Sequence, residues 1–143
     1  LIIAPRHPER FAEVEKIASE YAKKYDFSFA KFSKTHNFKA KINLLDTLGE
    51  LVNVYTISDI VVLGGSFVPN IGGHNPIEGA QFNPVIISGE FIFNQKALFS
   101  LVENIYIAKA SEIDGIIDSG AKKSKIAVQA SADAIIEDIR STL

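Results

Sequence analysis

Short apolar runs alternate along this chain with longer segments in which apolar residues return every three or four positions. The runs lie at residues 1–4, 27–32, 42–45, 59–63, 84–88 and 105–108, and each predicts a strand. Helical spacing and helix-start residues predict helices over about 9–24, 47–57, from 76 onward, 94–103, 111–119 and 122–143. In the first of these helices the apolar stripe consists of Phe11, Val14, Ile17, Ala18 and Tyr21.

Most of the strand segments are unbroken apolar runs and not alternating ones. That pattern is typical of a parallel sheet buried on both faces, and the alternation of strands with helices predicts a doubly wound α/β fold with a mostly parallel sheet. The length of 143 residues suits one domain, so we expect residues 1–143 to form a single domain. In such a fold, ligands bind outside the carboxyl ends of the strands.

The amino-acid composition excludes several classes of function. A net charge of −2 argues against a nucleic-acid partner, and the absence of cysteine excludes disulfides, thiol catalysis and cysteine-ligated metals. No apolar run approaches the length of a membrane span, and no signal peptide is visible. The sequence opens at Leu1 inside an apolar run, so we expect a soluble piece of a longer polypeptide.

The segment 64–78 carries the most distinctive chemistry. Two glycine pairs flank a loop between a predicted strand and a predicted helix, and glycine permits close backbone approach. Asn75 is a good N-cap, Pro76 suits the first helical position and Glu78 follows three residues after the cap. The free N–H groups of such a helix start suit a phosphate or a carboxylate. The alternative is that Asn75 and Glu78 form only a capping pair.

Two further segments follow predicted strands. Thr47 and Glu50 fit a capping box, and Gly49 leaves backbone open to a ligand, although an ordinary helix start explains the same residues. In the segment 5–8, Arg6 suits a bidentate contact to phosphate or carboxylate, and the alternative is a rigid exposed turn between two prolines.

The remaining polar features are less specific. The basic segment 31–41 could attract an anionic partner, but a solvated loop accounts for it more simply. The three histidines share no metal-ligand motif, and neither a catalytic carboxylate pair nor a nucleophile elbow is present. No metal and no cofactor are expected.

Three motifs together resemble the C-terminal half of bacterial 3-deoxy-D-manno-octulosonic acid (Kdo) transferases: residues 4–10, 46–51 and 64–78. The resemblance covers nearly the whole chain. It implies the Rossmann-like C-terminal domain of a GT-B glycosyltransferase, which binds the donor CMP-Kdo. The family transfers Kdo to a lipid A precursor in lipopolysaccharide inner-core biosynthesis, at the cytoplasmic face of the inner membrane. The acceptor surface, the membrane attachment and the carboxylate general base belong to the N-terminal domain, so no catalytic residue and no transfer by this chain alone are expected.

The resemblance also implies CMP contacts, position by position. Arg6 would approach the phosphate, the segment 49–51 would meet the nucleotide largely through its backbone, and Glu78 would accept hydrogen bonds from the ribose hydroxyls. The complete set of implied CMP contacts is Pro5, Arg6, Gly49, Glu50, Leu51, Ser66, His74, Asn75, Pro76, Ile77 and Glu78.

The chain departs from the family pattern in two places. The family usually has Gly-Pro-His after the fifth strand, where this chain has Gly89-Glu90-Phe91, and the segment 66–72 is one residue longer than usual. Two other hypotheses stay open: another GT-B enzyme, such as a UDP-sugar transferase or epimerase, and a non-catalytic flavodoxin-like regulatory module. The segment 64–78 argues against the first of these, and the absence of clustered acids after the first strand argues against a receiver-like form of the second.

Overall fold

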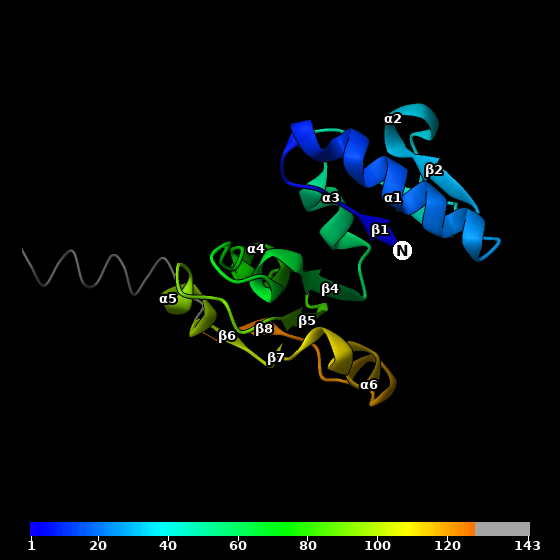
Figure 1. Ribbon diagram of the computed structural model, residues 1–143. Helices are drawn as coiled ribbons and strands as arrows, with labels where there is room; N and C mark the ends of the chain where they lie inside the picture. The colour runs from blue at the N-terminus through cyan, green and yellow to red at the C-terminus, as the bar shows by residue number, and fades with distance from the viewer. Residues whose placement is uncertain (128–143) are drawn as a thin grey trace, which may run out of the picture. The chain divides into compact units, whose positions relative to one another are not determined.

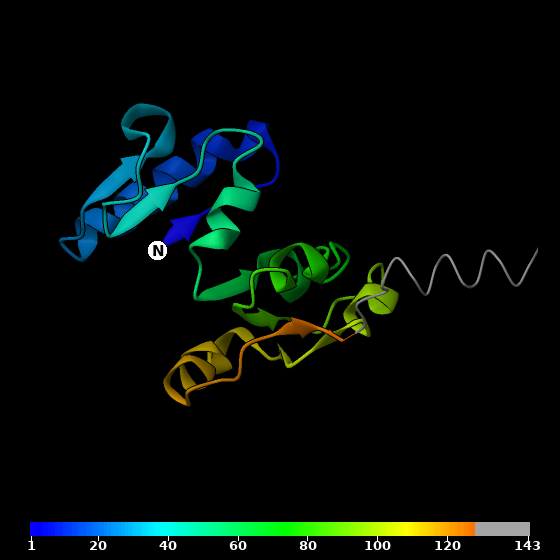
Figure 2. The ribbon, with the colours of Figure 1, turned by 180° about the vertical axis from the view of Figure 1, so that it is seen from behind.

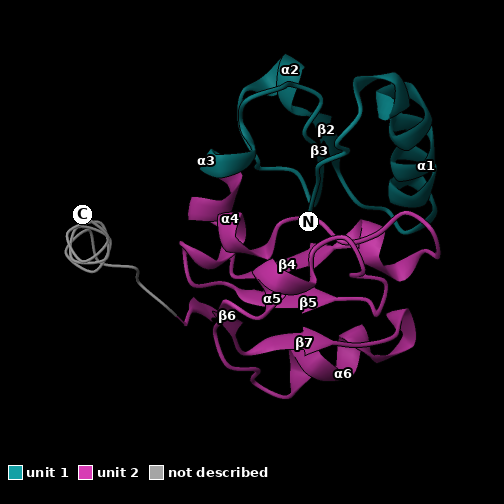
Figure 3. Cartoon of the chain, turned by 90° about the vertical axis from the view of Figure 1, so that its left-hand side faces the viewer, with its two compact units in different colours: residues 1–53 teal, residues 54–143 magenta. Residues whose placement is uncertain are grey.

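Residues 1–127 are described by the computed structural model (Figure 1). They divide between two compact units, Leu1–Asn53 and the residues from Val54 onward, which Figure 3 shows in teal and magenta. Each unit holds a three-stranded parallel sheet with its own core. The predicted α/β class with parallel strands is therefore confirmed, and the hydrogen bonds assign the parallel strands to two sheets.

The first unit is built on the sheet order β1-β3-β2, with strands Ile2–Ile3 (β1), Ile42–Leu44 (β3) and Phe29–Lys31 (β2). A 3₁₀ turn at Pro8–Arg10 leads into helix α1, Phe11–Lys24, and a four-residue helix α2, Phe32–Thr35, follows β2. Helix α1 lies in front of the sheet in Figure 1 and behind it in Figure 2, so it covers one face. Ala18, Ala22 and Ile42 are buried there.

The small residues of α1 make this contact, while larger ones of the predicted stripe stay in water. Ile17 is 56% exposed and Tyr21 is 55% exposed. They line an apolar groove of about 270 Å³ together with Leu1, Ile3, Val14, Ala18 and Ile42. The periodicity thus located the helix correctly, but this unit covers only part of its apolar face.

The second unit is built on the order β4-β5-β7, with strands Ile60–Leu63, Val85–Ser88 and Ile105–Ile107. All pairings are parallel, and Leu63 lies opposite Ser88. A separate antiparallel pair joins β6, Val102–Glu103, to β8, Lys125–Ile126. Helix α3 (Leu51–Thr56) crosses the boundary between the two units. The helices that lie wholly within the described part of the second unit are α4 (Pro76–Ala80), α5 (Lys96–Phe99) and α6 (Ile113–Asp118), with 3₁₀ turns at Gly64–Phe67 and Ala110–Glu112.

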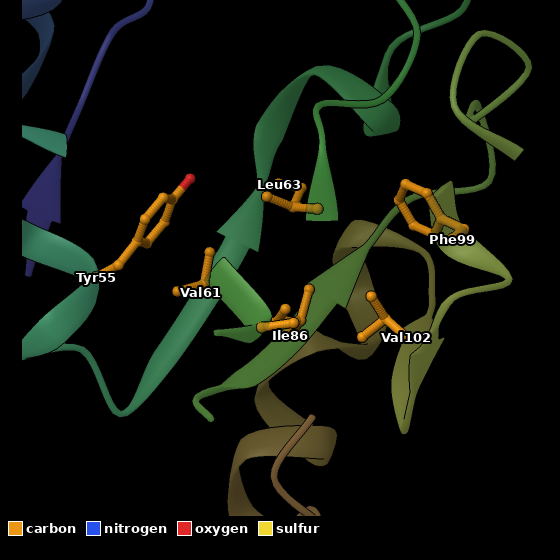
Figure 4. Close-up of a cluster of buried hydrophobic side chains, with 7 residues drawn as sticks. Tyr55, Val61, Leu63, Ile86, Phe99 and Val102 are labelled. Carbon is orange, nitrogen blue, oxygen red and sulfur yellow. The ribbon is translucent and has the colours of Figure 1, made fainter. Parts of the chain in front are cut away.

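Strand β5 is buried on both faces, as its unbroken apolar sequence predicts. Ile86 points into one cluster with Val61, Leu63 and Tyr55, which also includes Ala80, Phe99 and Val102 (Figure 4). Ile87 points to the opposite face, where Ile113 and Ile116 of α6 contribute to the packing. Helices on both faces of this sheet give the doubly wound arrangement.

Three expected helices differ from the structure. The helix expected at 47–57 begins only at Leu51, and that expected at 94–103 is confined to Lys96–Phe99, with β6 after it. The helix expected from 122 is wrong for residues 122–127, none of which is helical and of which Lys125–Ile126 form β8. Ser124 explains this difference, because its amide donates to Pro84 O and its hydroxyl accepts from the amide of Ile86. Residues 128–143 of that helix lie outside the described residues.

Substitution Ile86→Ala tests whether β5 is the centre of the second core. Ile86 is 0% exposed, so we expect the free energy of unfolding to fall by about 2–5 kcal/mol in urea denaturation followed by circular dichroism. Val62→Ala on β4 is the matched control, because Val62 is 44% exposed and should cost less than half as much. Equal losses for the two variants would contradict this assignment of the core.

Candidate functional site

The predicted site residues of the first unit share one edge of its sheet. Strands β1 and β3 are parallel neighbours, so the segments that follow them leave the sheet on the same side. Pro5 and Arg6 follow β1, and Gly49, Glu50 and Leu51 follow β3. Arg6 is exposed and Pro5 is half-buried, so the guanidinium is accessible to an anion.

The loop after β3 is held by Asp46, a residue that the sequence reading did not select for a role. Its Oδ1 accepts from the amide of Ser33 at 2.8 Å, and its Oδ2 accepts from the hydroxyl of Ser33 at 2.6 Å. Lys31 Nζ lies 3.6 Å from Asp46 Oδ2 and 2.6 Å from Glu15 Oε2. Lys31 is thus part of an ion-pair network, whereas the sequence placed it in a solvated loop.

The pKa of the Asp46 carboxyl lies below its ordinary value. Burial raises the pKa, but the hydrogen bonds from the Ser33 hydroxyl and amide, together with the charge of Lys31, outweigh burial. The pKa of Lys31 is raised, mainly by its hydrogen bond to Glu15. Both shifts favour the charged forms, so this network anchors the start of the segment 46–50 at neutral pH.

The predicted capping box of Thr47 and Glu50 does not form. Helix α3 begins at Leu51, Thr47 Oγ1 is buried without a hydrogen-bond partner, and Glu50 Oε2 accepts from Asn53 Nδ2 at 2.8 Å. The cause is Gly49, whose φ of +84° lies in the left-handed region and cannot continue a right-handed helix. The backbone from 47 to 50 is therefore an open turn before the helix.

The other predicted residues belong to the second unit, between the end of β4 and α4. Ser66 is fully buried, and its hydroxyl donates to Leu63 O while it accepts from the Gly89 amide at 2.7 Å and from Ser88 Oγ at 2.9 Å. These three bonds use the full capacity of a hydroxyl. Ser66 therefore holds the loop after β4 against the segment after β5, and its side chain has no bond left for a ligand.

A second contact between the same two segments involves Asn94. Its Oδ1 accepts from the Gly73 amide at 2.9 Å, and its Nδ2 donates to Gly73 O at 3.2 Å. The adjacent Gly72 has a φ of +86°. Asn94 was not predicted as a site residue, because the sequence alone did not show that residue 94 lies against residue 73.

At the start of α4, Asn75 caps the helix and also contacts Glu78, as the sequence predicts. Asn75 Oδ1 accepts from the Ile77 amide at 3.0 Å, and Asn75 Nδ2 lies 3.3 Å from Glu78 Oε1. Asn75 and Glu78 therefore do form a capping pair. The Glu78 carboxylate is nevertheless exposed, and its oxygens can accept further hydrogen bonds. Pro76 is buried, whereas His74 and Ile77 are half-buried.

Tyr55 lies near this helix and was missed by the sequence reading. Its pKa is raised, first by burial and then by the negative charge of Glu78. The phenol is therefore neutral at physiological pH, and Figure 4 shows its ring beside Val61 at the margin of the core. The sequence alone gave no sign that residue 55 lies close enough to Glu78 for the carboxylate charge to act on it.

A hollow of about 300 Å³ opens where β5 and β7 end. Glu90 and Phe91 line one side, and Lys109 and Glu112 line the other, with the Lys109 amide donating to Glu112 Oε2 at 2.7 Å. None of the site residues predicted from the sequence lines this hollow. Glu90 and Phe91 are the positions at which the chain departs from the family pattern.

Residues 1–127 contain neither a candidate metal site nor a helix that could span a membrane. No group of three or more acidic or histidine side chains in this range is arranged to hold a metal ion. Within the same range, no helix combines the length and apolar character that crossing a bilayer requires.

Comparison with known proteins agrees with the resemblance carried by the motifs. A 3-deoxy-D-manno-octulosonic acid transferase of Haemophilus influenzae is 32% identical over 145 residues, which cover all of this chain and 29% of that protein. A bifunctional glycosyltransferase/methyltransferase of Fusobacterium nucleatum is 37% identical over 98 residues, covering 66% of this chain and 14% of that protein. No family model matches the chain.

A solved structure supports the same conclusion at the level of the fold. The crystal structure of the C-terminal CMP-Kdo binding domain of WaaA from Acinetobacter baumannii matches with a TM-score of 0.70 and 28% identity. The match covers 82% of this chain and 62% of that one. The chain is thus an α/β protein with Kdo transferase homologues in several species, and it spans less than a third of the Haemophilus relative.

Asp46→Asn tests the network that anchors the loop after β3. A carboxyl with a lowered pKa contributes stability that is complete above its unfolded value of about 3.9 and disappears as the pH falls through the folded value. We therefore expect wild type to exceed the variant in free energy of unfolding at pH 6, and the difference to shrink below about pH 4. Urea denaturation at each pH measures this difference.

Asp59→Asn is the control for the loss of a carboxylate, because Asp59 is exposed and forms no ion pair among residues 1–127. A difference between wild type and the Asp46 variant that stays constant from pH 6 to pH 3 would contradict the role given to Asp46.

Proposed function

We propose that this chain is the donor-binding part of a Kdo transferase and binds CMP-Kdo. The observation that carries the proposal is the similarity to a crystal structure whose subject is a CMP-Kdo binding domain, with a TM-score of 0.70. The Haemophilus Kdo transferase supports it, since the similarity covers the whole chain. In this proposal the complete protein transfers Kdo from CMP-Kdo to a lipid A precursor.

The donor contacts in the proposal are those that the motifs imply. From the first unit they are made by Arg6 with Pro5 and by the open turn at 49–51. From the second unit they are made by His74 and by residues 75–78, with Ser66 acting through the loop it holds and not through its own hydroxyl. Arg6 would stabilise the charge that develops on the departing CMP phosphate.

The remaining functions of the complete protein fall outside this chain in the proposal. The chain spans 29% of the Haemophilus relative, which leaves room for a GT-B partner domain with the acceptor surface, the general base and the membrane attachment. Localisation at the cytoplasmic face of the inner membrane would follow from that region. By itself the chain would bind donor and transfer nothing.

Titration with CMP and UDP tests the proposal. We expect amide resonances of the segments 5–6, 49–51 and 74–78 to shift with CMP in ¹H–¹⁵N NMR spectra, and we expect weaker binding of UDP. The two ligands differ both in the base and in the number of phosphates, and a site for a cytidine monophosphate should prefer CMP on both counts. Equal or preferential binding of UDP would favour another GT-B nucleotide-sugar enzyme, and binding of neither nucleotide would overturn the proposal.

Glu78→Gln tests the ribose contact separately. Hydrogen bonds to a charged acceptor contribute about 1.5–3 kcal/mol, so we expect CMP affinity to fall about ten- to hundredfold. The melting temperature should stay unchanged, because a glutamine oxygen can still accept from Asn75 Nδ2. Wild type should prefer CMP to 2′-deoxy-CMP, and the variant should lose that preference.

Glu20→Gln on α1 is the matched control, since Glu20 is exposed and far from the segment 74–78 in sequence. A lower melting temperature with unchanged CMP affinity in the Glu78 variant would assign Glu78 to helix capping alone.

A further inference from the structure

The segment after β5 holds the loop after β4 at two separate points. At the first point, the Ser66 hydroxyl accepts from the Gly89 amide, and Ser66 O accepts from the Phe91 amide at 3.0 Å. A Cβ at residue 89 would stand 2.2 Å from Ser66 O, so only glycine allows this approach. The contact fixes the beginning of the loop.

The second point is the pair of hydrogen bonds between Asn94 and Gly73. A carboxamide that accepts from the N–H and donates to the C=O of one residue presents the same donor and acceptor that a neighbouring strand would present. The two residues are 21 positions apart, so the contact closes a long stretch of chain. It fixes the far end of the loop, immediately before His74 and Asn75.

The packing around the Asn94 contact leaves little room for a side chain at residues 72 and 73. A Cβ at Gly72 would stand 2.5 Å from Asn94 Oδ1 and 2.9 Å from Asn94 Nδ2. A Cβ at Gly73 would stand 3.3 Å from a methyl group of Ile92. Because Gly72 also has a φ of +86°, the second glycine pair is explained by the Asn94 contact and the backbone turn.

We propose that Asn94 is a positioning residue, which sets the direction in which the chain enters the segment 74–78 and so places that segment for the donor. The proposal rests on the proposed function for the identity of the donor. It gives a role to the segment 89–94, in which Glu90 and Phe91 depart from the family pattern. The hydrogen bonds from 89–94 to the loop use the backbone of residues 89 and 91 and the side chain of residue 94, so the side chains at 90 and 91 can change without breaking them.

Three variants separate positioning from other effects. Asn94→Ala removes both hydrogen bonds, and Asn94→Asp keeps an acceptor but replaces the donating NH₂ by an oxygen that faces Gly73 O. Asn70→Asp is the matched control, because Asn70 is exposed in the same loop and the same charge is introduced there. We expect CMP to bind about tenfold more weakly to either Asn94 variant at pH 7.5, because a segment 74–78 that holds its binding conformation only about one-tenth of the time loses affinity by that factor.

The pH profile of Asn94→Asp is the readout that a merely structural role would not produce. A protonated carboxyl carries one donor and one acceptor, as the amide does, so it can restore both bonds to Gly73. The ratio of the variant and wild-type dissociation constants should therefore return toward one as the pH falls from 7.5 to 4.5. Using the ratio cancels the titration of CMP itself. Asn94→Ala and Asn70→Asp should show no such recovery.

The outcomes distinguish this inference from the function it rests on. If wild type does not bind CMP, the proposed function fails, and the assignment of the loop to the donor fails with it. If wild type binds CMP and both Asn94 variants bind equally well at every pH, only the inference is overturned. Unchanged hydrogen exchange at the Gly73 amide in Asn94→Ala would also overturn it, whereas faster exchange with a melting temperature within a few degrees of wild type supports it.

Discussion

Parallel pairing of apolar strands is the constraint on which the rest of this structure depends. Strand β5 is buried from Val85 to Ser88 and lies between two parallel neighbours, so it can present no charged group to either face. Strand β3 has the same position in the first unit. Polar chemistry is therefore displaced to the ends of the strands, where the chain turns back into helices. Arg6, the open turn at Gly49 and the loop from 64 to 78 all follow strand ends for this reason.

The sequence predicted the strands and the class of fold well because these depend on local composition. Unbroken runs such as 84–88 fit only a strand buried on both faces, and the spacing of apolar residues in 9–24 fits only a helix. The helix boundaries that the sequence predicted wrongly depend on contacts between residues far apart in the chain or on the backbone conformation of one glycine. Ser124 bonds to Pro84 and Ile86, and these bonds hold the start of β8 beside β5 where the composition of residues 122–127 predicted a helix. The start of α3 depends on the left-handed backbone of Gly49, which a pattern of residue types does not reveal.

The residues of the candidate site also divide into those that local sequence reveals and those that only distant contacts reveal. Motifs identified the segments that carry the chemistry, since glycine pairs, an N-cap and a following glutamate are all visible in sequence. They did not identify two residues that hold those segments, because Asp46 acts through Ser33 and Asn94 acts through Gly73. Ser66 was chosen for contact with a ligand, and the structure uses its hydroxyl entirely within the protein.

The bonds that hold the loop after β4 involve its main chain at Ser66 and Gly73 and one side chain, the Ser66 hydroxyl, and this has a consequence for which residues can vary. The Asn94 side chain bonds to the amide and the carbonyl of Gly73, and the amides of residues 89 and 91 bond to the hydroxyl and the carbonyl of Ser66. None of these bonds involves a side chain from residues 67 to 71. Substitutions at residues 67 to 71 remove none of these bonds, whereas a side chain at Gly72 would collide with Asn94. The side chains at residues 67 to 71 are therefore the part of this loop that can vary without breaking either set of bonds.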